Sequence, residues 1–149
     1  MIFLGCDHAG FKAKQAAIKF LEKKKIEFKD LGAFNDEKSD YPDYCFPVAR
    51  SVANKKNSFG LLFCGSGEGA VICANKVKGI RAALVFNDYT AIQPREHEDA
   101  NIACFAARIH SQKQILKWIE LFLKTKPSNA QRHKKRVKKI NEFEKKWLK

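Results

Sequence analysis

The chain has 149 residues, 45% of them hydrophobic and 30% charged, which is typical of one soluble domain with its own core. No apolar run approaches the roughly 18 residues of a membrane helix, and five cysteines without a Cys-x-x-Cys pair argue against a disulfide framework or a zinc site. The net charge is +13, but residues 124–149 hold 11 Lys/Arg and 2 Asp/Glu, so +9 lies in the tail and only +4 in the rest.

Strand-like and helix-like segments alternate along the chain. A strand at Met1–Cys6 precedes a helix at Phe11–Lys25, a strand at Ile26–Leu31 and a polar loop at residues 35–40. A helix then runs from Tyr41 to about Asn54 with Pro47 inside it, followed by a strand at Phe59–Cys64 and a helix ending near Val77. Next come a strand at Gly79–Phe86, a helix at Asp88–Glu96 with Pro94 inside it, a strand at Asn101–Ala107 and a helix at Gln112–Lys124. After a break at residues 126–129, a last helix is expected over about residues 130–148.

This alternation predicts a parallel sheet covered by helices on both faces, in a single domain spanning residues 1–149. Ligands bind such sheets beyond the carboxyl ends of the strands. The polar groups expected at that edge are Asp7-His8, Cys64 with its glycines, and Asn87-Asp88. The last helix lies outside the alternation, and its apolar stripe needs a surface to cover, for which another subunit is a candidate. That stripe consists of Val137, Ile140, Phe143 and Trp147.

Cys64 is the most informative residue, because it ends an apolar strand and is followed by Gly65, Gly67 and Gly69. A thiol at a strand end that faces a helix amino terminus has its anion stabilised by the peptide dipole and by free N–H groups. Glycines allow those N–H groups to approach an oxygen that becomes negative during a reaction, and Ser66 adds a hydroxyl. A cysteine at a strand end is otherwise most often a core residue. The flanking glycines favour a reactive thiol that is open to a substrate.

Other polar residues have two interpretations each. Asp7-His8 is either a turn with a solvated histidine or part of a site, and His97 is either a surface residue or an acid–base group. Arg132 and Arg136 share a helix face because they are four residues apart. They form either a solvated basic stripe or a grip on a phosphate dianion, which suits the arginine fork.

Two further functions stay open from these residues alone. Gly65-x-Gly67-x-x-Ala70 fits the dinucleotide-binding fingerprint, and Asp88 follows the next strand, where a ribose-binding acid lies in such enzymes. That interpretation leaves the strand-end cysteine and the arginine pair without a role. The basic tail favours nucleic-acid binding, although exposed aromatic residues for base stacking are not interleaved with it.

Seven short motifs occur in order from Phe3 to about Glu144. They are Gly5-Cys-Asp-His-Ala-Gly-Phe11, Asp40-Tyr-Pro42, Cys64-Gly-Ser-Gly-Glu-Gly69, Ala74-Asn-Lys76, Gly79-Ile-Arg81, His97-Glu-Asp-Ala-Asn101 and Arg132-His-Lys-Lys-Arg136. Each motif is modest by itself, but together and in register they are highly specific. With them the chain resembles the family of type B ribose-5-phosphate isomerases, which also holds galactose-6-phosphate isomerase subunits.

The resemblance implies a Rossmann-like three-layer α/β/α sandwich with a five-stranded parallel sheet and an extra C-terminal helix. It implies a homodimer or dimer of dimers with active sites between subunits, working without metal or organic cofactor and without nucleic acid or membrane partners. Reduced thiols and the lack of a leader-like segment are typical of a cytoplasmic protein.

The implied reaction is the aldose–ketose isomerisation of ribose 5-phosphate and ribulose 5-phosphate, in the non-oxidative pentose phosphate pathway, through an enediolate. A hexose 6-phosphate of the allose or galactose type is the alternative substrate.

The resemblance also implies residue roles. Cys64 is expected to carry the proton between C1 and C2, and the backbone of residues 65–69 with Ser66 to stabilise the enediolate. His97 is expected to protonate the ring oxygen and open the furanose, with Asp7 and Tyr41 nearby. The residues expected to hold the phosphate are His8, Arg108, Arg132 and Arg136. The other residues expected to contact the substrate are Gly65, Gly67, Glu68, Gly69 and Glu98.

Two positions depart from the family's pattern. The family usually has asparagine after the catalytic histidine, where this chain has Glu98. An amide donates to a sugar hydroxyl, whereas a carboxylate only accepts and repels the phosphate. Some members lack the cysteine and place a glutamate base at the position of Ala70. Because Glu68 lies two residues short of that position, Cys64 is the predicted base here.

Overall fold

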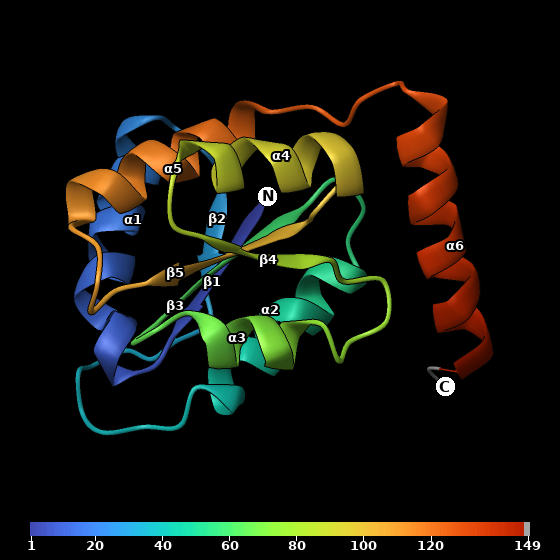
Figure 1. Cartoon of the computed structure of the whole chain (residues 1–149). Helices are drawn as coiled ribbons and strands as arrows, with labels where there is room; N and C mark the ends of the chain where they lie inside the picture. Colours follow the sequence, from blue (N-terminus) through green and yellow to red (C-terminus); the bar gives the residue numbers. More distant parts are fainter. Residues whose placement is uncertain (148–149) are drawn as a thin grey trace.

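A five-stranded parallel sheet forms the centre of the structure, a computed structural model that describes residues 1–147 (Figure 1). Its strands are β1 (Ile2–Cys6), β2 (Phe28–Asp30), β3 (Phe59–Cys64), β4 (Ala82–Val85) and β5 (Ile102–Ala106), in the order β2-β1-β3-β5-β4. Neighbouring strands are parallel, with Cys6 opposite Phe63 and Cys64 opposite Ala106. The carboxyl ends of β1, β3 and β5 therefore lie together at one edge of the sheet.

Helices cover both faces of this sheet (Figure 1). They are α1 (Phe11–Lys23), α2 (Pro42–Ala53), α3 (Glu68–Ala74), α4 (Asp88–Glu98), α5 (Gln112–Lys124) and α6 (Gln131–Trp147), and a 3-10 turn, η1 (His8–Gly10), joins β1 to α1. The helices α1, α4 and α5 lie on one face, and α2 and α3 lie on the other. The helix α6 stands beside this sandwich and packs mainly against α4.

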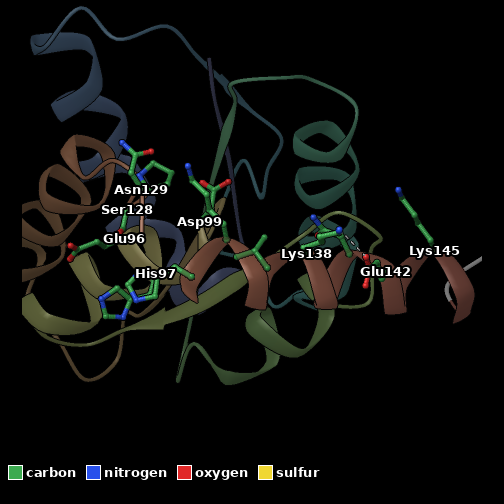
Figure 2. Close-up of a pocket in the computed structure, with 13 residues that line it drawn as sticks. Glu96, His97, Asp99, Ser128, Asn129, Lys138, Glu142 and Lys145 are labelled. Carbon is green, nitrogen blue, oxygen red and sulfur yellow. Dashed lines mark ion pairs between the residues drawn. The ribbon is translucent and has the colours of Figure 1, made fainter. Parts of the chain in front are cut away.

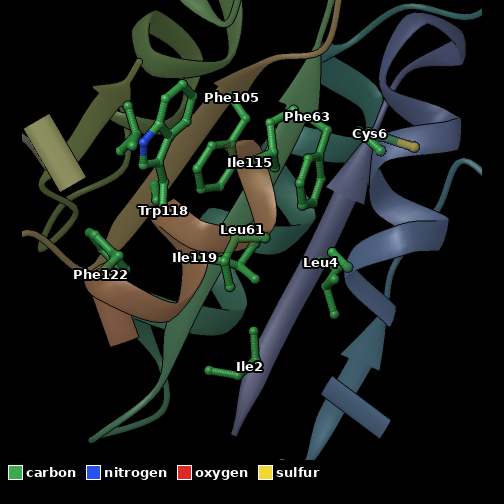
Figure 3. Packing of buried hydrophobic residues seen from close by; sticks show 14 of the residues in the cluster. Ile2, Leu4, Cys6, Leu61, Phe63, Phe105, Ile115, Trp118, Ile119 and Phe122 are labelled. Atoms are coloured by element: carbon green, nitrogen blue, oxygen red, sulfur yellow. The ribbon is translucent and has the colours of Figure 1, made fainter. Parts of the chain in front are cut away.

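The larger core lies between the sheet and the layer of α1, α4 and α5 (Figure 3). Alternate residues of each strand point into it, because side chains of a strand alternate between the two faces. Its centre is formed by Phe63 and Phe105, whose rings stack with centroids 5.3 Å apart. The helix α5 closes it with the apolar face that its sequence spacing predicts: Ile115, Trp118, Ile119 and Phe122.

The second core lies between the sheet and the pair α2 and α3. The other alternate strand residues point into it, among them Leu62, Cys64 and Cys104. Each strand therefore contributes side chains to both cores. This is why the strands appear in the sequence as continuous apolar runs. The side chain of Cys64 lies in this second core at its carboxyl edge, and all five cysteines are free thiols.

The predicted order of strands and helices is confirmed, and some ends differ. The strand β4 begins at Ala82 rather than Gly79, because the chain turns at Gly79, where φ is +82°. The helix α3 ends at Ala74 rather than Val77, since the next residues form turns. Pro47 lies inside α2 without ending it. Among residues 1–147, no helix has both the length and the apolar character needed to cross a membrane.

Most of the apolar stripe of α6 is uncovered in the single chain, although Val137 is half-buried. Its residues Ile140, Phe143 and Trp147 are 42%, 63% and 62% exposed. Only His133 and Glu144 of this helix are buried in the part of the chain that the structure describes. Residue 148, the expected end of the helix, lies outside the described residues.

Candidate active site

The thiol of Cys64 lies under the glycine loop that joins β3 to α3. Its Sγ accepts a hydrogen bond from the backbone N–H of Gly67 at 3.1 Å. Gly67 is the N-cap residue just before α3, with a φ of +82° that favours glycine. The local geometry therefore matches the predicted arrangement of a strand-end sulfur facing backbone donors at a helix start.

Burial changes the charge state of this thiol. The Cys64 side chain is 4% exposed, so in the single chain the sulfur is covered and not open as expected. Burial raises the pKa of Cys64, although hydrogen bonds from the backbone of Ala70, Gly67 and Ser66 act in the opposite direction. The expected donors are therefore present, but burial has the larger effect on the pKa of this thiol in the isolated chain.

The glycines of the loop are required by close contacts. A Cβ on Gly69 would lie 2.7 Å from Cζ of Tyr41, and one on Gly67 would lie 2.3 Å from Cδ1 of Leu84. A Cβ on Gly65 would lie 3.1 Å from Nη1 of Arg108. Tyr41 and Arg108, which come from other segments of the chain, therefore flank the loop. Tyr41 was expected near His97, and within the single chain it lies beside this loop instead.

Asp7 and His8 lie at the same edge, directly after β1. The N–H of Asp7 donates to the carbonyl of Phe63 at 3.3 Å, and its buried carboxylate accepts from the N–H of Gly10 at 3.0 Å. Nδ1 of His8 lies 3.1 Å from the carbonyl oxygen and 3.2 Å from the nitrogen of Ser39. His8 is therefore a held side chain and not a freely solvated one.

A first group of predicted residues is thus assembled at the carboxyl edge of the sheet, and we call it the thiol group. It comprises Asp7, His8, Tyr41, Cys64, Gly65, Ser66, Gly67, Glu68, Gly69 and Arg108. Ser66 and Glu68 are exposed, whereas the sulfur beneath them is covered.

His97 lies elsewhere, on the last turn of α4. Its Nδ1 is 2.8 Å from the side-chain nitrogen of Gln93, one turn earlier. Its ring lies against that of His133 on α6, with centroids 4.0 Å apart and a tilt of 33°. Nε of Arg132 donates to Nε2 of His133 at 3.2 Å.

His97 and His133 border a pocket of about 450 Å³ between the end of α4 and α6 (Figure 2). Glu96, His97 and Asp99 line it from α4 and its end, and Lys138 and Glu142 line it from α6. We call His97, Glu98, Arg132 and Arg136 the histidine group, because all four act on the charge state of His133 there.

The two groups lie at opposite ends of the sheet. Cys64 pairs with Ala106 at the end of β5, whereas Ile102 pairs with Gly60 at its beginning. His97 lies in the last turn of α4, which leads back to the beginning of β5, and the two ends of β5 are four residues or about 13 Å apart along the sheet. One chain therefore does not bring Cys64 and His97 to the same substrate.

The arrangement speaks against the dinucleotide interpretation. The carboxylate of Asp88 accepts from Nε1 of Trp118 at 3.0 Å and from Nζ of Lys117 at 2.5 Å, both on α5. The glycine loop leads into α3 on the other face of the sheet. The acid and the loop therefore do not converge on one ligand.

Two residues that contact His97 were not predicted as site residues: Gln93 and His133. The contact of His133 with His97 is tertiary, so helical spacing does not reveal it. The only signal in the sequence is that His133 stands between Arg132 and Arg136. Among residues 1–147, no three His, Cys, Asp or Glu side chains are grouped so as to hold a metal ion.

Comparison with known proteins gives matches over almost the whole chain. The sequence matches the Ribose/Galactose Isomerase family over residues 2–140. It is 41% identical over 144 residues to a probable ribose-5-phosphate isomerase B of Mycoplasma pneumoniae, covering 96% of this chain and 94% of that protein.

Solved structures confirm the predicted fold class. Ribose-5-phosphate isomerase B of Clostridium thermocellum has a TM-score of 0.93 to this chain at 40% identity, covering 98% of each. That of Mycoplasma genitalium, solved with bound ribulose-5-phosphate, has a TM-score of 0.91 at 38% identity, covering 97% of this chain and 95% of that one.

Proposed function

The chain belongs to the ribose/galactose isomerase family, and we propose that it interconverts D-ribose 5-phosphate and D-ribulose 5-phosphate. The observation that carries this proposal is the likeness to the Mycoplasma genitalium isomerase with bound ribulose-5-phosphate, which extends over 97% of this chain. The reaction belongs to the non-oxidative pentose phosphate pathway, and we propose that it takes place in the cytoplasm without a metal or organic cofactor.

Ring opening is the first step, and His97 is its acid. The side-chain nitrogen of Gln93 only donates, so Nδ1 of His97 accepts and the neutral ring carries its proton on Nε2. Nε2 delivers this proton to the ring oxygen as the bond between that oxygen and C1 breaks. The hydroxyl on C1 gives its proton through water back to His97, so the ring is neutral again and the open-chain aldehyde is left.

Proton transfer between carbons is the second step, and Cys64 is its base. The thiolate takes the hydrogen from C2, and the electron pair moves to the oxygen on C1 to give the enediolate. The backbone N–H groups of residues 65–69 and the exposed hydroxyl of Ser66 are the donors for that oxygen. The sulfur returns the proton to C1, and the hydroxyl proton passes from O2 to O1, which gives the ketose.

The phosphate supplies much of the binding energy. Arg132 and Arg136 are both exposed on α6, and Arg108 and His8 lie at the opposite edge with the thiol. A dianion between these groups is bound by forked, charged hydrogen bonds. Fixing the phosphate also holds C1 and C2 beside the sulfur.

A second copy of the chain completes the site. We propose a homodimer, alone or paired into a dimer of dimers, in which the thiol group of one chain faces the histidine group of the other. The separation of Cys64 and His97 by the length of the sheet supports this. Exposed apolar side chains, which a partner would bury, lie on or beside three elements: Ile72 of α3, Phe86 after β4, and Ile140, Phe143 and Trp147 of α6.

An assay of the purified protein tests the proposal. Ribose 5-phosphate, ribulose 5-phosphate, allose 6-phosphate and galactose 6-phosphate are each supplied with EDTA present, and the products are separated. The pentose phosphates are expected to interconvert, with kcat/KM at least tenfold above that of either hexose phosphate. Turnover of the hexose phosphates alone would mean that the substrate is a hexose phosphate, in a chain that has Glu98 where the family usually has asparagine. No turnover of any sugar phosphate would refute the proposal.

A further inference from the structure

The buried histidine of α6 joins two parts of the proposed site. His133 is 4% exposed, although α6 as a whole is a solvent-facing helix beside the sandwich. Its ring stacks on that of His97, and its Nε2 accepts from Nε of Arg132. The same side chain therefore contacts the proposed ring-opening acid and a proposed phosphate-binding arginine.

The hydrogen bonds define the protonation of both rings. A guanidinium N–H only donates, so Nε2 of His133 is an acceptor and its proton lies on Nδ1. That atom is buried and has no hydrogen-bond partner among the described residues. His97 has the opposite tautomer, because its Nδ1 accepts from Gln93.

The charge state of His133 suits a supporting role. Burial lowers the pKa of His133, and the nearby His97, Arg132 and Arg136 lower it further, while Glu98 acts in the other direction. These neighbours favour the neutral form of the His133 ring. A cation at this position would face His97 and two arginines, which is unfavourable.

The attachment of α6 adds to this argument. The helix packs mainly on α4, and the segment before it is tied to α4 by the N–H of Ser128, which donates to the carbonyl of Glu96 at 2.8 Å. The His133 ring is the buried contact next to that tie. Through its contact with the His97 ring it joins the first turn of α6 to the last turn of α4.

We propose that His133 is a positioning residue with two separable contacts: its ring sets the orientation of His97 for ring opening, and its Nε2 sets Arg132 for phosphate binding. The inference rests on the proposed isomerase function and deepens it. Loss of the ring stack is expected to lower kcat, and loss of the hydrogen bond to Arg132 is expected to raise KM.

Two conservative variants separate the contacts. His133→Phe keeps an aromatic ring against His97 and removes the acceptor for Arg132. His133→Gln keeps an acceptor oxygen and removes the ring. Since an error of about 1 Å in a reacting group costs on the order of 100-fold, the Gln variant is expected to lose about 10- to 100-fold in kcat for ribose 5-phosphate with KM within threefold of wild type. The Phe variant is expected to keep kcat within about threefold and to raise KM about fivefold or more.

A second measurement shows whether the loss lies in ring opening. Ribulose 5-phosphate has no furanose form, because its O5 carries the phosphate, so exchange of its C1 hydrogen in D2O needs Cys64 and not ring opening. At saturating substrate, this exchange is expected to stay within threefold of wild type in His133→Gln. Lys139→Ala, an exposed change on the same helix, is the control and is expected to match wild type.

A lower kcat in His133→Gln together with a higher KM in His133→Phe supports the inference. A loss of folding would instead lower the activity of both variants in the same way. Equal changes in the two variants, wild-type kinetics in both, or a loss of exchange equal to the loss of isomerisation would overturn it. An inactive wild-type protein refutes the isomerase function itself and is seen before any variant is made.

Discussion

Mixing two inactive variants tests whether the active site is shared between subunits. Cys64→Ala removes the proposed base from one edge of the sheet, and His97→Asn removes the proposed acid from the other. The two positions lie by opposite ends of β5, which are about 13 Å apart in one chain, whereas both must touch a five-carbon substrate. Each homodimer is therefore expected to be inactive, but a heterodimer holds one complete site and one doubly defective site.

The size of the rescue follows from the twofold symmetry. Random reassociation makes half of the dimers mixed, and each mixed dimer has one intact site of two, so about a quarter of wild-type activity is expected. The variants are co-expressed with different tags, and the mixed dimer is purified and assayed with ribose 5-phosphate. The purified mixed dimer should then have about half the wild-type kcat with an unchanged KM.

The matched control pairs Cys64→Ala with the double variant Cys64→Ala/His97→Asn. Its mixed dimers contain no thiol base at all and should be inactive. The test sample is the purified dimer of one Cys64→Ala chain and one His97→Asn chain. An activity of this mixed dimer below 1% of wild type would refute the shared site, because complementation fails when both residues act within one chain.

Three other outcomes are expected. Because burial raises the pKa of Cys64 and the thiolate is the proposed base, kcat/KM should rise with pH and still be rising beyond about pH 8.5, the ordinary pKa of a thiol; a plateau reached near pH 7 would contradict this. Gly67→Ala should lower the free energy of unfolding by about 2–4 kcal/mol through both its φ of +82° and its overlap with Leu84. Gly79 has the same φ but open space around it, so Gly79→Ala should lower the free energy of unfolding by only about 1–2 kcal/mol. Denaturant titrations of the two variants compare these values, and equal losses would mean that the overlap with Leu84 is relieved. Phe143→Asp, which charges the exposed stripe of α6, should yield a monomer without isomerase activity in sedimentation and kinetic measurements, and an active dimer would place the interface elsewhere.

The thiol shows what local sequence does and does not determine. The run from Phe59 to Gly69 predicts a strand, a turn and backbone donors at the sulfur, and the hydrogen bond from Gly67 to Sγ confirms that geometry. The direction of the pKa shift was not predictable in the same way. It depends on the second core, which encloses Cys64 through contacts made by α2 and α3, and burial of that kind is a tertiary property.

The histidine pocket shows a second limit. The spacing of Arg132 and Arg136 predicts a shared helix face, and the segment around His97 reads as polar and exposed. Nothing in either segment indicates that His133 turns inward and stacks on His97. Such a contact is fixed by how α6 approaches α4 after the break at residues 126–129, and irregular connections carry little periodic signal.

The division of the site follows from the architecture itself. In a parallel sheet, residues that follow strands collect at the carboxyl edge, and the end of each crossover helix returns to the amino edge. Cys64 follows a strand, whereas His97 ends the helix that leads back to β5. A single layer of such units cannot place both at one point without a long insertion, which this chain lacks among its described residues. A twofold axis can set the carboxyl edge of one chain against the α4–α6 end of the other. Such an axis brings a thiol group and a histidine group together at two places, through a single kind of contact surface. In the proposed dimer, the exposed stripe on α6 and the separation of the thiol group from the histidine group within one chain are two consequences of the same symmetry.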